Sequence, residues 1–115
     1  MGEINKEQFI ENFQYFDKEI VLEIIDIFLK EYPGRIQSIT DNIESDDYDN
    51  LKFNSHSIKG VIANFVAPKV EQQARELEVM GTEKDTKGAK ELFEEFKTSS
   101  SIMIAELEEL RENFM

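Results

Sequence analysis

The chain has 115 residues, of which 40% are hydrophobic and 33% charged, and it contains no cysteine. This composition predicts one soluble globular domain, residues 1–115, and excludes disulfides and thiolate chemistry. A formal net charge of −12 argues against general nucleic-acid binding, which requires a cationic surface.

The N-terminal residues lack the apolar core of a signal peptide. Asn5 is a typical helix-capping residue, and Gln8 stands three positions later, as in a partial capping box. Phe9, Phe13 and Phe16 then mark an apolar side at helical spacing. The pattern predicts a short first helix.

Asp17 is the next capping residue and opens a long helical segment. Pro33 interrupts this segment and must remove one backbone hydrogen bond, so we expect a kinked helix through Pro33, although two separate helices remain possible. Glu23 and Asp26 break its most apolar part, which excludes a membrane span. Core packing explains the apolar positions better than a cofactor or membrane role: Ile20, Ile24, Phe28, Ile36, Ile39 and Ile43.

Asp47 can cap a third helix that begins at Tyr48. We expect this helix to end near Val66–Ala67, because Pro68 disfavours helical backbone in the preceding residue and suits the first turn of a new helix.

The fourth helix should place Val70, Ala74 and Leu77 inward and end with Gly81 as its C′ residue. A polar loop, residues 82–87, follows.

The last helix should run from about Thr86 to Phe114, with weak helix formers in its middle at residues 98–101. One side carries Leu92, Phe96, Met103, Leu107, Leu110 and Phe114. Short connections between long amphipathic helices predict an all-α protein, an antiparallel four-helix bundle with an extra short N-terminal helix.

One tract in the third helix differs from the rest of this acidic chain. Residues 51–70 contain three lysines and no acid, whereas 25 acids in 115 residues would place about four in such a window. The tract contains His56, the only histidine. Its local charge is therefore unusual for this protein.

On a helix, Leu51, Ser55, Ile58, Ile62 and Phe65 form one stripe that should face the core. His56 projects about 140° from the centre of that stripe, toward solvent.

The neighbours of His56 one turn away are Lys52, Phe53, Lys59 and Gly60. A glycine inside a helix costs about 1 kcal/mol relative to alanine. Gly60 therefore suggests that something must come close to His56.

These residues resemble a known family. His56-Ser57-Ile58-Lys59-Gly60, followed by Ala63-Asn64, is similar to the His-x-Leu-Lys-Gly…Ala-Asn signature of histidine phosphotransfer (HPt) domains. The resemblance extends to the Phe28–Pro33 run, the Asp47-Tyr48 turn and the Leu77-Glu78…Gly81…Asp85 segment. Ile58 replaces the usual leucine, and Val66 stands where a glycine is common.

The resemblance implies a phosphorelay intermediate in two-component signalling that works in the cytoplasm. His56 would accept a phosphoryl group from a receiver-domain aspartate, or from a sensor kinase, and pass it to another response regulator. Lys59 would stabilise the phosphoryl group and Gly60 would leave room for the partner. The docking surface would include Lys52, Phe53, Ala63 and Asn64.

The implied partners are response-regulator receiver domains and a hybrid sensor histidine kinase, with neither nucleic acid nor membrane among them. We expect a monomer that has no cofactor or metal site of its own, with Mg²⁺ only in the receiver domain.

Other interpretations remain open. A lone surface histidine with a lysine three residues later is often only part of a solvated face. A degenerate HPt-like adaptor would bind a receiver domain without being phosphorylated. An autonomous enzyme is disfavoured, because the chain has no cysteine, no second histidine and no glycine-rich phosphate loop.

Overall fold

Five α-helices account for most of the computed structural model, which describes residues 2–115. Their bounds are α1 (Lys6–Phe13), α2 (Lys18–Glu44), α3 (Tyr48–Ile62), α4 (Pro68–Glu83) and α5 (Thr86–Arg111), with 3₁₀ turns η1 (Ala63–Phe65) and η2 (Glu112–Phe114).

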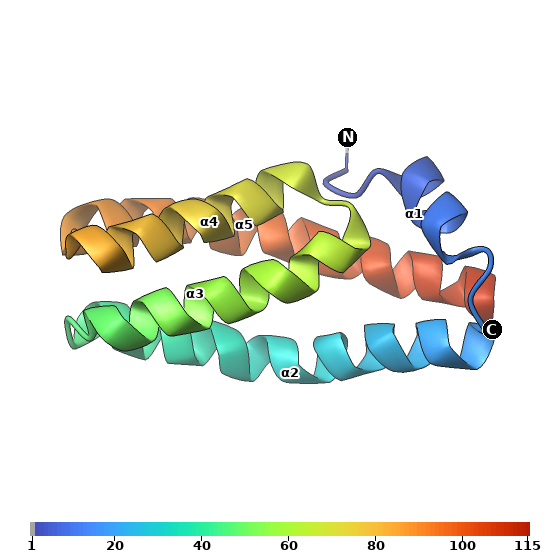
Figure 1. Ribbon diagram of the computed structural model, residues 1–115, viewed down its shortest axis with the longest axis horizontal. Helices are drawn as coiled ribbons and strands as arrows, with labels where there is room; N and C mark the ends of the chain where they lie inside the picture. The colour runs from blue at the N-terminus through green and yellow to red at the C-terminus, as the bar shows by residue number, and fades with distance from the viewer. Residues whose placement is uncertain (1) are drawn as a thin grey trace.

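The four long helices run antiparallel, and α1 lies beside the end of the bundle where α3 leads into α4 (Figure 1). Around the bundle, α3 packs between α2 and α4, and α5 packs between α4 and α2. The molecule measures 42 × 24 × 19 Å. The predicted all-α bundle with a short N-terminal helix is confirmed.

Helix starts follow the capping residues in the sequence. The side chains of Asn5, Asp17 and Asp47 each accept a hydrogen bond from a backbone N–H two or three residues later, which satisfies one of the free donors of the first turn. Pro68 occupies the first turn of α4, where its missing N–H has no cost.

The predicted capping box of α1 is only half formed. Gln8 donates its side-chain N–H to Asn12 rather than reaching back to the cap. The backbone N–H of Asn5 instead donates to the carbonyl of Val66, at 2.8 Å. This bond ties the N-terminal segment to the turn that follows α3.

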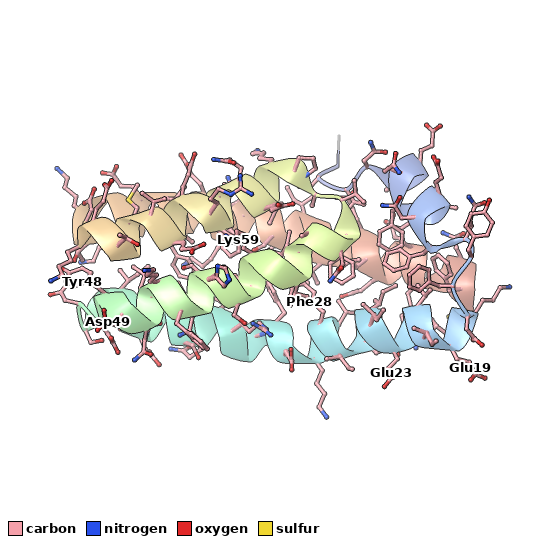
Figure 2. All side chains as sticks on the ribbon, viewed as in Figure 1. Glu19, Glu23, Phe28, Tyr48, Asp49 and Lys59 are labelled. Carbon is pink, nitrogen blue, oxygen red and sulfur yellow. The ribbon has the colours of Figure 1, made fainter. Side chains whose placement is uncertain are left out.

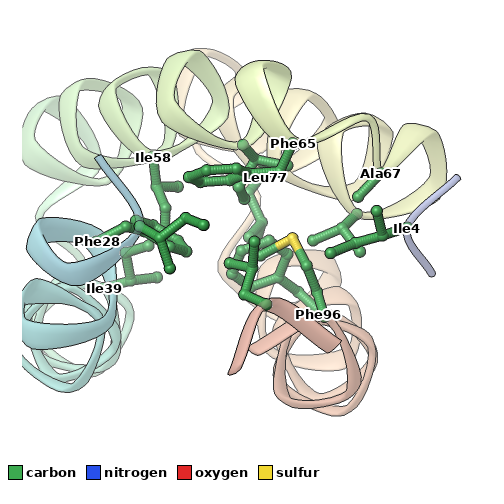
Figure 3. Close-up of a cluster of buried hydrophobic side chains, with 14 of the residues drawn as sticks. Ile4, Phe28, Ile39, Ile58, Phe65, Ala67, Leu77 and Phe96 are labelled. Carbon is green, nitrogen blue, oxygen red and sulfur yellow. The ribbon is translucent and has the colours of Figure 1, made fainter. Parts of the chain in front are cut away.

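The core fills the space between the helices with large apolar side chains (Figure 3). The inward residues predicted for α4 and α5 are all buried. In α2, Phe28, Ile39 and Ile43 are buried as predicted. Ile20, however, is 49% exposed, and Ile24 and Ile36 are only partly buried. In the first turns of α2 the buried positions belong to Val21 and Ile25 instead. Phe16, expected on the apolar side of α1, lies beyond the helix and is 50% exposed.

Helix α2 continues without interruption through Pro33, so one helix rather than two is present. An internal proline costs about 3 kcal/mol and an internal glycine about 1 kcal/mol. The adjacent Pro33 and Gly34 are both exposed. Phe28 and Ile39, buried on either side, hold the two halves of the helix against the same core.

The end of α3 differs from the prediction. The α-helix stops at Ile62, η1 follows, and Val66 adopts the left-handed conformation with φ of 56°. A β-branched residue is strained there, because its Cβ crowds the backbone. Val66 thus makes the turn at the position where a glycine is common in the HPt domains that this chain resembles, and the turn leads directly into α4.

The end of α4 also differs. The helix continues through Gly81 to Glu83, and Lys84 with φ of 58° makes the left-handed cap predicted for Gly81. Only Lys84 and Asp85 separate α4 from α5, so the expected six-residue loop is wrong. Gly81 instead allows close packing, since a Cβ there would lie 2.9 Å from the backbone nitrogen of Lys52.

Helix α5 includes the weak helix formers, as predicted, and its last turn is the 3₁₀ helix η2. Ser99 and Ser100 are buried, and the Ser100 hydroxyl bonds to Tyr32 of α2 at 2.5 Å. Tertiary packing therefore compensates for low helix propensity. No helix within residues 2–115 has both the length and the apolar character needed to cross a membrane.

Candidate functional site

The site lies on the outer face of α3. Burial of Ser55 and Ile58 fixes the rotation of this helix and turns His56 away from the core. The His56 side chain is 67% exposed, in agreement with the predicted projection. The side chain of Lys59 lies toward α4 and is only 20% exposed (Figure 2).

A carboxylate from α4 connects these two side chains. Glu78 places Oε2 3.1 Å from His56 Nδ1 and Oε1 2.7 Å from Lys59 Nζ. Glu78 was not among the predicted site residues, although it belongs to the segment that resembles the HPt family. It lies 22 residues beyond His56, and only the antiparallel packing of α3 on α4 brings the two together.

The hydrogen bond from Lys59 is the main reason that the pKa of Glu78 lies below its ordinary value of 4.5. Burial opposes this shift, and the charge of Lys59 and the hydrogen bond from His56 add to it. Glu78 is therefore ionised at neutral pH and has no proton to donate. The Nδ1 atom of a neutral His56 must then be the donor, which leaves the lone pair on Nε2.

An open hollow adjoins His56, lined by Asp49, Lys52, Phe53, His56 and Glu78. Phe53 is 69% exposed at its edge, so the imidazole lies beside a free aromatic surface. The acid-free tract does not keep carboxylates away from the site, because Glu78 approaches from α4 and Asp49 from the first turn of α3.

Gly60 faces open space. A Cβ added there would have no heavy atom of another element within 4 Å, so packing within the chain does not require a glycine. Of the other residues predicted to contact a partner, Lys52 lines the hollow, while Ala63 and Asn64 are exposed in η1 and lie outside it. The expected surface therefore extends along α3 beyond the hollow.

Within residues 2–115, no group of three or more histidine, cysteine or acidic side chains could hold a metal ion. The chemistry available at the site is that of one nucleophilic imidazole nitrogen, an ammonium group and a carboxylate that orients both.

Comparison with protein-family models gives a match to the Hpt domain over residues 23–113. Neither the comparison with curated proteins nor that with solved structures gives a match. The matched region contains α3 and α4 in full, and so includes His56, Lys59 and Glu78.

Proposed function

We propose, from the premise that this chain belongs to the Hpt domain family, that His56 is a phosphoryl carrier between receiver domains. Members of this family serve phosphotransfer in two-component signalling and interact with receiver domains and kinases. In this chain the phosphoryl group would be carried by Nε2 of His56.

The contact between His56 Nδ1 and Glu78 is the observation that carries the proposal. It selects the tautomer with the proton on Nδ1, so the nucleophilic Nε2 faces outward from a side chain that is 67% exposed. An exposed and oriented lone pair suits attack on a group presented by another protein.

In the forward step, Nε2 attacks phosphorus and the bond from phosphorus to the receiver's aspartate oxygen breaks. The electron pair leaves with the aspartate, which becomes a carboxylate. His56 keeps its Nδ1 proton, and the positive charge that develops on the ring lies next to ionised Glu78. Attack by a second receiver's aspartate on the same phosphorus reverses the step.

The surrounding residues have separate roles in this proposal. Lys59, held by Glu78, stabilises the phosphoryl oxygens. Gly60 leaves room for the receiver, and Lys52, Phe53, Ala63 and Asn64 contact it. The magnesium ion belongs to the acidic pocket of the receiver, and the chain itself supplies no cofactor and no kinase activity.

The test is transfer of radioactive phosphoryl label from phosphorylated receiver domains to the purified chain. We expect label that is lost in acid and stable in base in the wild type, none in His56→Gln, and none when ATP alone replaces the receiver. Label that remains in His56→Gln would contradict the assignment. Binding of receivers without any label in the wild type would favour the adaptor.

A further inference from the structure

Glu78 contacts the imidazole of His56 on the side away from the reacting nitrogen. Its Oε2 lies 3.1 Å from Nδ1, and its Oε1 lies 2.7 Å from Lys59 Nζ, so both carboxylate oxygens are held. The Glu78 side chain is 21% exposed, whereas that of His56 is 67% exposed. Because Nε2 lies across the ring from Nδ1, a phosphoryl group bonded to Nε2 leaves the contact with Glu78 in place.

A phosphorylated imidazole exists in two forms, with and without the proton on Nδ1. When the aspartate of a receiver attacks phosphorus, the N–P bond breaks and its electron pair stays on Nε2. A ring that carries the Nδ1 proton then leaves as neutral imidazole, whereas a ring without it leaves as an imidazolate anion, a much poorer leaving group. Imidazole has a reference pKa of about 6.5, so a neighbouring charge decides which form predominates near neutral pH.

The ionised carboxylate of Glu78 favours the protonated form. A carboxylate without a proton can only accept hydrogen bonds, so it pairs with protonated Nδ1 and repels the lone pair of a bare nitrogen. A negative charge at hydrogen-bond distance also stabilises a cationic neighbour. Glu78 stays ionised across the neutral range, because the hydrogen bond from Lys59 holds its pKa below the ordinary value of 4.5.

Ion pairs neutralise charged groups on the two helices that flank α3. Arg35 of α2 pairs with Glu31, and Arg75 of α4, one turn before Glu78, pairs with Glu71. Each pair lies within a single helix and carries no net charge. Neither pair therefore favours a cationic ring on α3.

On α3 itself, the charged groups near His56 are Asp49, Lys52 and Lys59. Asp49 and Lys52 line the hollow with opposite charges. Lys59 is cationic and disfavours a second positive charge beside it. Retention of the Nδ1 proton on a phosphorylated ring therefore depends on Glu78.

We propose that Glu78 is a positioning residue that keeps Nδ1 of His56 protonated after phosphorylation, and thereby keeps the phosphoryl group transferable at neutral and mildly alkaline pH. This inference rests on the proposed function and adds the residue that maintains the carrier in its reactive form. Without the charge of Glu78, the phosphorylated ring loses its proton at lower pH and releases the phosphoryl group more slowly.

The test is the pH profile of transfer from the phosphorylated full chain to an excess of unphosphorylated receiver domain. Glu78→Gln keeps the size of the side chain and an acceptor oxygen but removes the charge. Dividing its rate constant by that of the wild type at each pH cancels the pH dependence of the receiver. We expect this ratio to be close to one at about pH 6 and to fall about tenfold by about pH 8.5.

Two controls separate charge from shape. Glu76→Gln is the same substitution at an exposed position of α4, and its ratio should stay at one at every pH. Lys59→Met removes the positive charge next to the phosphoryl group but leaves the negative charge of Glu78. Its ratio should lie below one throughout and should not fall as the pH rises.

Imidazole ¹⁵N spectra of the phosphorylated proteins test the proton itself, without a transfer rate. The wild type should lose the Nδ1 proton about one pH unit above Glu78→Gln. Loss at the same pH in both proteins would overturn the proposal.

A ratio for Glu78→Gln that is independent of pH would also overturn the proposal, because it would show that Glu78 only maintains the shape of the site. The same holds if the folded variant fails to transfer even at the acidic end of the range. These results leave the proposed function intact, since the wild type still transfers. Absence of label in the wild type would instead contradict the function itself.

Discussion

Gly81 of α4, which packs on one face of α3, and Gly60 on the outer face of α3 serve opposite purposes. On the face toward α4, a Cβ at Gly81 would collide with the backbone of Lys52, so the helices can approach only because glycine is there. On the outer face, a Cβ at Gly60 would meet nothing. What surrounds a helical glycine, rather than its presence in a helix, distinguishes a packing requirement from a surface kept open for a partner.

Val66 completes the contrast. Its backbone has φ of 56°, the conformation that favours glycine, yet the residue is valine. The side chain packs against the core, and this burial offsets part of the strain. The protein therefore lacks glycine at a position where the backbone favours it, and has glycine at Gly60 where the backbone does not.

The largest effect is expected at the packed face. Gly81→Gln should destabilise the fold by about 3 kcal/mol, because the added atoms must displace the α3 backbone. Urea denaturation measures the loss. A variant as stable as the wild type would show that the two helices can move apart freely.

Gly60→Gln is the matched change on the open face. Its stability should equal that of the wild type or exceed it by up to about 1 kcal/mol, since glycine is the poorer helix former. Transfer from a receiver should fall about 100-fold, because the new side chain blocks close approach to His56. A lower melting temperature, or unimpaired transfer, would contradict the view that Gly60 leaves room for the receiver.

A smaller effect concerns the pair of Lys59 and Glu78. Because the folded pKa of Glu78 lies below 4.5, the pair stabilises the fold above about pH 4.5, and this contribution is lost as the pH falls through the folded pKa. Lys59→Met should therefore cost about 1 kcal/mol at neutral pH and little once Glu78 is protonated.

The effect is measured by the unfolding free energy of Lys59→Met at pH values above and below the folded pKa of Glu78. Lys90→Met is the control for loss of an exposed lysine. If the free energy of unfolding of Lys59→Met stays below that of the wild type at low pH, Lys59 contributes packing rather than charge.

The smallest effect is expected at Val66. Val66→Gly relieves backbone strain but loses packing, so its stability should change by less than about 0.5 kcal/mol. The same change at Val61, a partly buried residue inside α3, should cost about 2 kcal/mol. Similar losses at both positions would show that the turn at Val66 carries no strain.

The helices and most of the core could be predicted from the sequence, because capping residues and apolar spacing are local signals. The ends of α3 and α4 could not be predicted, because Val66 and Lys84 adopt left-handed conformations that are uncommon for valine and lysine. The site was half predictable: His56, Lys59 and Gly60 share one helix turn, whereas the contact with Glu78 depends on the register between two helices.

The single histidine allows a direct test of the central claim. Long-range ¹H–¹⁵N spectra of the ¹⁵N-labelled chain contain one side-chain imidazole, which can be followed while a phosphorylated receiver is added. We predict that phosphorylation occurs on Nε2 and that the proton stays on Nδ1, next to Glu78. A spectrum that stays unchanged while the receiver loses its phosphoryl group, or phosphorylation on Nδ1, would contradict the account.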